Sequence, residues 1–178
     1  MRIITGEECQ LYLGKAFYDQ WNDGSWKRFT TSFVTGSDSG RLNALARTVS
    51  ASLGRVDGSV LLVEHTGIFP SSENIHLAET FRSAFGETRS IREAPAHVFS
   101  LHDALNFWSM MHICLLNFWD FLVVSGDRQV CVHGSHDEVI DIFALNEESL
   151  TKIRKLILPF KLKEYSHSDG KRLSRQPD

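Results

Sequence analysis

The feature that most constrains the fold is the long apolar stretch from Leu101 to Val124. Its first part repeats apolar side chains at helical spacing as far as Leu115, and it ends in a run that is typical of a strand. Histidine, asparagine and aspartate residues interrupt the stretch, which argues against a membrane span. Two further short strands follow over residues 129–133 and 139–143, after turn residues. The pattern predicts a central helix followed by an antiparallel three-stranded meander.

Helices and strands alternate in the remainder of the chain. Thr5 and Glu8 have the spacing of a capping box, and the helix that they begin has apolar residues as far as Tyr18. The other predicted elements are helices over residues 41–53, 72–85 and 147–158 and strands over residues 26–34 and 60–63. We therefore expect an α+β fold, with a mixed or antiparallel sheet of about four or five strands and helices packed on it. A single domain is predicted over residues 1–165, and a polar, disordered tail over residues 166–178.

The charge of the chain bears on the partners that it suits. The net charge is −3, and residues 161–178 carry five basic and three acidic side chains, which leaves −5 on residues 1–160. An acidic body gives no argument for nucleic acid as a partner and suits a basic protein. The first residues lack the apolar segment of a signal peptide, so we expect a cytoplasmic protein. The three cysteines include no C-x-x-C pair, which argues against a disulfide framework and the common zinc spacings.

One short segment has the residue types of a metal or hydrolytic site. His133, His136 and Glu138 lie close together in the sequence, and imidazole and carboxylate groups together can hold zinc or another divalent ion. Strand alternation would place the two histidines on opposite faces unless Gly134 bends the chain, and a polar hairpin turn is the simpler interpretation. Cys131 and His133 would share a strand face, which allows a Cys–His pair.

No complete catalytic signature is present in the sequence. Glu73 and His76 have the spacing of a di-iron ligand pair, but the second copy that such a centre needs is missing. The chain has no nucleophile elbow, phosphate-binding loop or dinucleotide-binding glycine motif. We therefore expect no cofactor and favour a binding protein over an enzyme. A small metal-dependent or hydrolytic enzyme that uses the histidine–carboxylate segment is the alternative.

Three segments give the chain a resemblance to a group of known proteins. They are residues 67–77 (GIFPSSENIHL), residues 92–99 (REAPAHVF) and residues 135–138 (SHDE). Over residues 60–143 the chain resembles small bacterial proteins of poorly defined activity, which are similar to the immunity proteins encoded beside polymorphic or secreted toxins. A tryptophan often precedes the proline in that group, where this chain has Phe69. The resemblance implies a toxin-binding protein and no catalytic residue.

The first two segments also suggest a structural role. The residues at the predicted helix start, where polar side chains satisfy free backbone amides, are Ser71, Ser72, Glu73 and Asn74. Glu93 or His97 is predicted to hydrogen-bond to that turn and to hold the irregular segment 87–96 in place.

The function that these observations favour is neutralisation of a cognate toxin by covering its active site. Asp137, Glu138 and Asp141 are the predicted partner-binding residues, because carboxylates speed association with a basic protein and help to select it. Neither a membrane nor nucleic acid is expected among the partners.

Overall fold

The computed structural model describes residues 1–67 and 71–166. The predicted tail therefore lies outside the described residues apart from Ser166, and so does the part of the resemblance that involves Phe69 and Pro70. Within the described ranges, no helix combines the length and the apolar character needed to cross a membrane.

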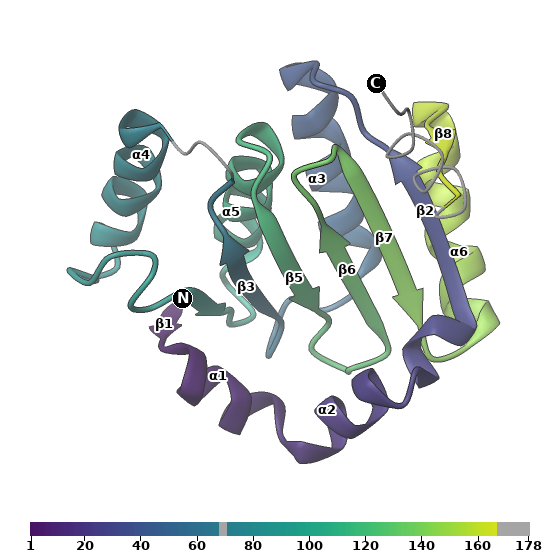
Figure 1. The fold of residues 1–178 in the computed structure, drawn as a ribbon, viewed down its shortest axis with the longest axis horizontal. Helices are drawn as coiled ribbons and strands as arrows, with labels where there is room; N and C mark the ends of the chain where they lie inside the picture. The colour runs from purple at the N-terminus through teal and green to yellow at the C-terminus, as the bar shows by residue number, and fades with distance from the viewer. Residues whose placement is uncertain (68–70, 167–178) are drawn as a thin grey trace, which may run out of the picture.

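The described residues form an antiparallel sheet of eight strands (Figure 1). In chain order the strands are β1 Arg2–Ile4, β2 Phe29–Val34, β3 Val60–His65, β4 Ala96–Val98, β5 Asp120–Val124, β6 Val130–Gly134, β7 Val139–Ala144 and β8 Lys163–Glu164. Their order across the sheet is β1-β4-β3-β5-β6-β7-β2-β8. The predicted meander is confirmed, because β5, β6 and β7 pair as neighbours. The predicted number of strands was too low, because β1, β4 and β8 are too short to show an alternating pattern.

Helices accompany the sheet on both of its faces. They are the α-helices α1 Gly6–Leu13, α2 Lys15–Asn22, α3 Ser39–Ser52, α4 Ser72–Ser83, α5 Ala104–Leu116 and α6 Glu147–Ile157, and the 3-10 helices η1 Ser25–Arg28 and η2 Leu158–Phe160. Figure 1 shows α3, α5 and α6 together on one face of the sheet. The capping box of Thr5 and Glu8 starts α1 as predicted, and Asn146 caps α6 by accepting the N–H of Ser149.

The two faces of the sheet belong to two hydrophobic cores. Val60 and Leu61 are adjacent in β3, both are fully buried, and they belong to different cores, as strand alternation requires. The larger core packs the first face against α3, α5 and α6 and includes Leu45 and Phe107. The smaller core packs the second face against α1 and α2 and includes Phe17. Because α1 and α2 lie at one end of the sheet (Figure 1), no helix among the described residues covers the other end of the second face, which we call the uncovered end.

Two predicted elements near the N-terminus differ from the observed ones. The helix predicted to continue from Thr5 to Tyr18 is divided at Gly14, whose φ of 80° lies in a region that glycine adopts without steric cost. Residues 26–28, predicted as the beginning of a strand, belong to η1 instead. Trp26 is 1% exposed in the smaller core, so burial of its ring rather than strand alternation explains its position.

Candidate functional site

The uncovered end of the second sheet face carries a histidine held between two carboxylates. His133 in β6 has its Nε2 atom 3.3 Å from Glu64 Oε2 and its Nδ1 atom 3.7 Å from Asp141 Oδ2. Glu64 belongs to β3 and reaches across β5, whereas Asp141 lies opposite His133 in the β6–β7 register. The His133 side chain is 29% exposed, so a partner or substrate can reach it from solvent. We call Glu64, His133 and Asp141 the His133 cluster.

The two carboxylates favour the positively charged form of the His133 imidazole. Asp141 contributes most and Glu64 next, and together they outweigh burial and raise the pKa of His133 from 6.5 to about 9. The Asp141 side chain is 10% exposed and that of Glu64 is 41% exposed, so water screens Glu64 more strongly. At neutral pH His133 is therefore an imidazolium, which donates hydrogen bonds and protons but cannot accept a proton.

A second histidine–carboxylate pair lies at the turn between β6 and β7. His136 donates its backbone N–H to Asp120 Oδ1 at 2.7 Å, and its Nδ1 atom is 2.9 Å from the same oxygen. The hydrogen bond to Asp120 is the main reason that the pKa of His136 lies above its usual value. The next residues of the turn are Asp137, whose carboxylate is 3.7 Å from His136 Nε2, and Glu138, which is partly buried and has a φ of 61°.

The predicted metal-site residues His133, His136 and Glu138 do not form one site. The two histidines are held by different carboxylates, because Gly134 ends β6 and the turn that follows directs His136 toward Asp120. Among residues 1–67 and 71–166, no three histidine, cysteine or acidic side chains are grouped in a way that could hold a metal ion. Cys131 shares the strand with His133, but it is fully buried and burial raises the pKa of its thiol, so it is not an activated nucleophile.

The three predicted partner-binding carboxylates have different environments. Asp137 and Glu138 lie at the turn, where the Asp137 side chain is 76% exposed and Glu138 is partly buried. Asp141 instead is buried against His133, so its prediction as a surface contact needs correction. Strand alternation explains the difference, because Asp141 lies within β7 on the face that also carries His133.

Sequence reasoning missed Glu64 and Asp120, which hold the two histidines. A usable signal was present in the antiparallel meander itself. Glu64 follows the apolar run of β3, Asp120 begins β5, and His133 comes near the end of β6. Because successive antiparallel strands run in opposite directions, the last residues of one strand and the first residues of the next lie at the same end of the sheet. Asp120 and His133 are thereby placed at a common end of the sheet from the sequence alone, whereas Glu64 joins them through the β3–β5 pairing, which lies outside the meander.

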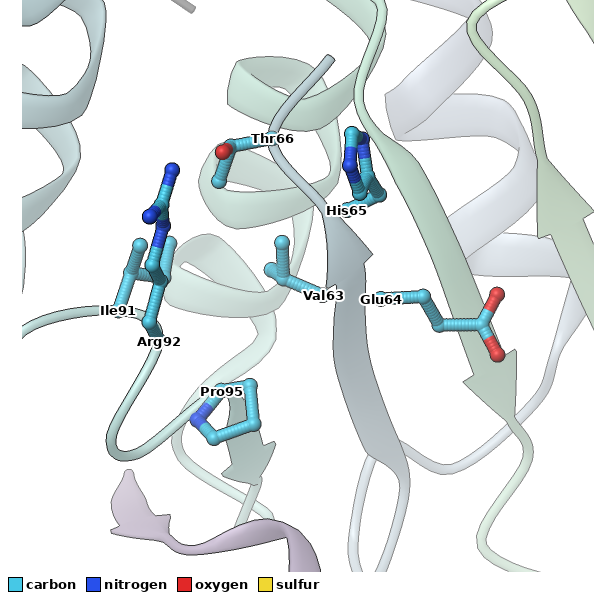
Figure 2. A pocket seen from close by; sticks show the side chains of 7 residues that line it. All are labelled: Val63, Glu64, His65, Thr66, Ile91, Arg92 and Pro95. Atoms are coloured by element: carbon cyan, nitrogen blue, oxygen red, sulfur yellow. The ribbon is translucent and has the colours of Figure 1, made fainter. Parts of the chain in front are cut away.

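A pocket of about 350 Å³ adjoins the His133 cluster, and Glu64 belongs to both (Figure 2). The residues that line it are Val63, Glu64, His65, Thr66, Ile91, Arg92 and Pro95. In Figure 2 the Glu64 side chain extends over β5, away from Arg92, and the Arg92 side chain extends toward Thr66. The pocket thus lies at the open side of β3, between this strand and the segment that precedes β4.

The predicted helix start over residues 71–74 is the N-terminus of α4. Ser71 is the N-cap, and its hydroxyl oxygen accepts the backbone N–H of Asn74 at 3.1 Å. Ser72 and Glu73 are exposed in the first turn, where the carboxylate of Glu73 interacts favourably with the helix dipole.

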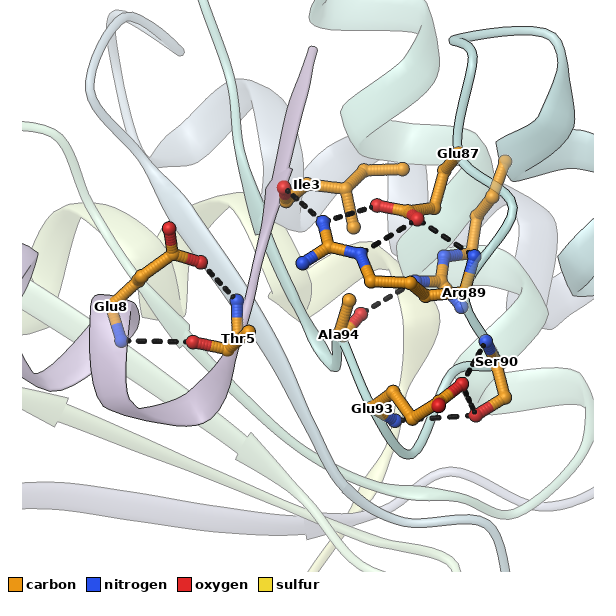
Figure 3. A network of polar contacts seen from close by, with 9 residues as sticks. Ile3, Thr5, Glu8, Glu87, Arg89, Ser90, Glu93 and Ala94 are labelled. Atoms are coloured by element: carbon orange, nitrogen blue, oxygen red, sulfur yellow. Dashed lines mark hydrogen bonds and ion pairs between the residues drawn. The ribbon is translucent and has the colours of Figure 1, made fainter.

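Glu93 and His97 do not bond to the start of α4, contrary to the prediction. The carboxylate of Glu93 accepts hydrogen bonds from the backbone N–H and the hydroxyl of Ser90, at 2.8 and 2.7 Å, and so closes its own turn (Figure 3). His97 is fully buried in β4, with its Nδ1 atom 3.3 Å from the Leu61 carbonyl oxygen. Burial is the main cause that lowers the pKa of His97 to about 3, so this imidazole is neutral and structural.

Arginines, rather than Glu93 and His97, hold the segment between α4 and β4. Arg82 of α4 is fully buried and donates from Nη2 to the Ala94 carbonyl oxygen at 2.6 Å. Arg89 donates to the Ile3 carbonyl oxygen at 3.2 Å and pairs with Glu87 at 2.6 Å (Figure 3). These contacts tie the segment to α4 on one side and to β1 on the other, which fixes the wall of the pocket that contains Arg92.

Comparison of the chain with models of protein families, with curated protein sequences and with solved structures gave no match.

Proposed function

We propose that this chain is an intracellular binding protein of the immunity type, which neutralises a cognate bacterial toxin by covering the toxin's active site. The observation that carries the proposal is the set of carboxylates at the uncovered end of the sheet, which are Glu64, Asp120, Asp137, Glu138 and Asp141. The negative charge of these carboxylates attracts a basic protein and orients it during association. The proposed location is the cytoplasm, where such a protein would meet its toxin.

The carboxylates have two roles in this proposal. Asp137 is exposed and Glu138 is partly exposed at a hairpin turn, where they can approach cationic groups of the toxin without first breaking a strong internal contact. Glu64 and Asp141 act indirectly, because they hold His133 as an imidazolium. The partner would therefore meet a positive group within a negative surface, and this charge pattern selects against proteins that are merely basic.

The test is co-purification of the chain with the product of the adjacent upstream gene, with growth inhibition by that product as a second measurement. We expect a one-to-one complex that suppresses toxicity. The double substitution Asp137→Lys and Glu138→Lys should weaken the complex about tenfold or more, mainly by slowing association. A matched control is Asp19→Lys with Asp57→Lys, which changes the charge equally at exposed positions away from the site.

Two outcomes would contradict the proposal in different ways. Equal weakening by both double variants would mean that only the net charge matters and would contradict a specific role for the turn. A neighbouring gene product that is folded and toxic but forms no complex would contradict the binding proposal as a whole.

A hydrolytic enzyme is the second candidate, and the His133 cluster is the observation that favours it. A histidine with one nitrogen near Asp141 and the other near a solvent-exposed carboxylate resembles the arrangement used in general acid catalysis. The raised pKa is consistent with a proton donor and argues against a general base at neutral pH. Turnover of ester or phosphodiester substrates that is lost in His133→Gln but kept in Asp137→Lys would support the enzyme over the binding protein.

A further inference from the structure

The sheet has a notch beside the second half of β3. β4 pairs with β3 only over residues 60–62, whereas β5 pairs with β3 as far as His65 on the other side. β3 is therefore an interior strand where it begins and an edge strand where it ends. The pocket lined by Arg92 and Thr66 lies along this open part of the strand (Figure 2).

Pro95 explains why the pairing stops at this point. The backbone N–H of Val63 donates to the Pro95 carbonyl oxygen at 3.0 Å. Proline has no N–H, so Pro95 cannot return a hydrogen bond to the carbonyl of Val63, and the ladder cannot continue. An open strand edge is a template on which another extended chain can pair through main-chain hydrogen bonds.

The side chains of the notch favour a partner segment that carries an acidic side chain. Its floor is apolar, since Val63 is 5% and Ile91 is 1% exposed, whereas Arg92 is exposed at its rim. Two carboxylates lie near the pocket and both are engaged: Glu64 is 3.3 Å from His133 and turned away from the pocket, and Glu79 accepts the backbone N–H of Ile91 at 3.4 Å. Arg92 forms no ion pair with any of the described residues, so its guanidinium can bind a carboxylate of another chain. An apolar floor below a guanidinium fits the methylene groups and the carboxylate of a glutamate side chain.

We propose that this notch binds an extended, acidic peptide segment of a partner protein, which adds as a strand to the open edge at residues 63–66 and places a carboxylate against Arg92. This surface adjoins the carboxylate-rich end of the sheet and shares Glu64 with it, but it prefers a partner group of the opposite charge. The inference therefore goes beyond the proposed function and does not depend on it. A pocket of about 350 Å³ accommodates one or two side chains of such a segment, while the strand edge supplies the main-chain contacts.

The experiment uses a display library of random octapeptides, selected against the full chain. We expect the selected peptides to share an acidic residue within an alternating, β-branched background. A synthetic peptide with the selected sequence should lose about tenfold or more affinity for Arg92→Glu. It should keep its affinity for Arg55→Glu, a matched charge reversal at an exposed position outside the pocket. Exchanging the acidic residue of the peptide for lysine should restore binding to Arg92→Glu.

Two further measurements separate strand addition from simple recognition of a carboxylate. Methylation of alternate backbone nitrogens in the peptide should abolish binding. Hydrogen exchange should show new protection of amides within residues 64–66 when the unmodified peptide binds, since the Val63 N–H is already bonded to Pro95. Equal binding of the methylated peptide, or full displacement by free glutarate, would mean that the pocket recognises only an anion and would overturn strand addition. Selected peptides without an acidic residue, or with equal affinity for Arg92→Glu and wild type, would overturn the proposal entirely. An unchanged melting temperature of Arg92→Glu checks that this variant is folded.

Discussion

Substituting His133 by glutamine should change how the stability of the protein depends on pH. The carboxylates of Glu64 and Asp141 raise the pKa of His133 from 6.5 to about 9 in the folded protein. A group whose pKa is raised by folding stabilises the native state fully below its unfolded-state pKa. That contribution decreases as the pH rises through the folded-state pKa. Stabilisation by the charged imidazole should thus be complete below pH 6.5 and lost above about pH 9.

The size of the effect follows from the same two pKa values. At about 1.4 kcal/mol for each pKa unit, the difference between 6.5 and about 9 corresponds to roughly 3.5 kcal/mol of unfolding free energy. This is an upper value, because the Glu64 side chain is 41% exposed and solvent weakens exposed ion pairs. Asp141, which is 10% exposed, keeps more of its interaction with His133. We therefore expect a change of about 1–2 kcal/mol across this pH range.

Urea denaturation of the wild type and of His133→Gln, at steps from about pH 6 to about pH 10, measures this change. The free-energy difference between the two proteins should shrink as the pH rises. Its absolute value also contains the cost of leaving Asp141 beside an uncharged amide, so only its variation with pH tests the reasoning. His102→Gln is the control, because His102 is exposed and belongs to neither histidine–carboxylate pair. A difference that stays constant from pH 6.5 to 9 would refute the argument.

Three other predictions concern stability and reactivity. Gly134→Ala should lower the unfolding free energy by about 1–3 kcal/mol, because the added Cβ would overlap the buried Phe121 ring. Thermal denaturation checks this against Gly6→Ala, whose added Cβ meets no atom within 4 Å, and similar melting temperatures for the two variants would contradict it. Ser71→Ala should cost about 1 kcal/mol by removing the N-cap of α4. Faster hydrogen exchange at the first amides of α4 would reveal this loss, and unchanged exchange would contradict it. All three cysteines are buried with pKa values raised by burial, so a thiol reagent should label them only after unfolding, and rapid labelling of the native protein would disprove their burial.

The fold could be predicted where its signals are local. The meander over residues 119–143 combines short apolar runs with turn residues, and both signals depend on neighbours in the sequence. The short strands β1, β4 and β8 give no such signal, because a strand of two or three residues is defined by its partner.

The candidate site was harder to predict, because it depends on register. A shift in the β3–β5 pairing occurs between Val63 and His65, next to Glu64. A bulge of this kind redirects a side chain, and periodicity within one strand cannot reveal it. His133 was therefore identified as a candidate from its residue type and neighbours, whereas its partner Glu64 was not.

The position of β2 has a consequence for the order in which the protein folds. β2 comes early in the chain, yet it lies between β7 and β8, and Thr35 Oγ1 donates to the Glu138 carbonyl oxygen across 103 residues. Contacts between such distant residues require a large loop to close before they give any stabilisation, which slows folding. During synthesis, both edges of β2 therefore remain unpaired until β7, the first of its two neighbours, has left the ribosome. We expect pulsed hydrogen exchange during refolding to protect β5, β6 and β7 before β2, and simultaneous protection of all four strands would contradict this order.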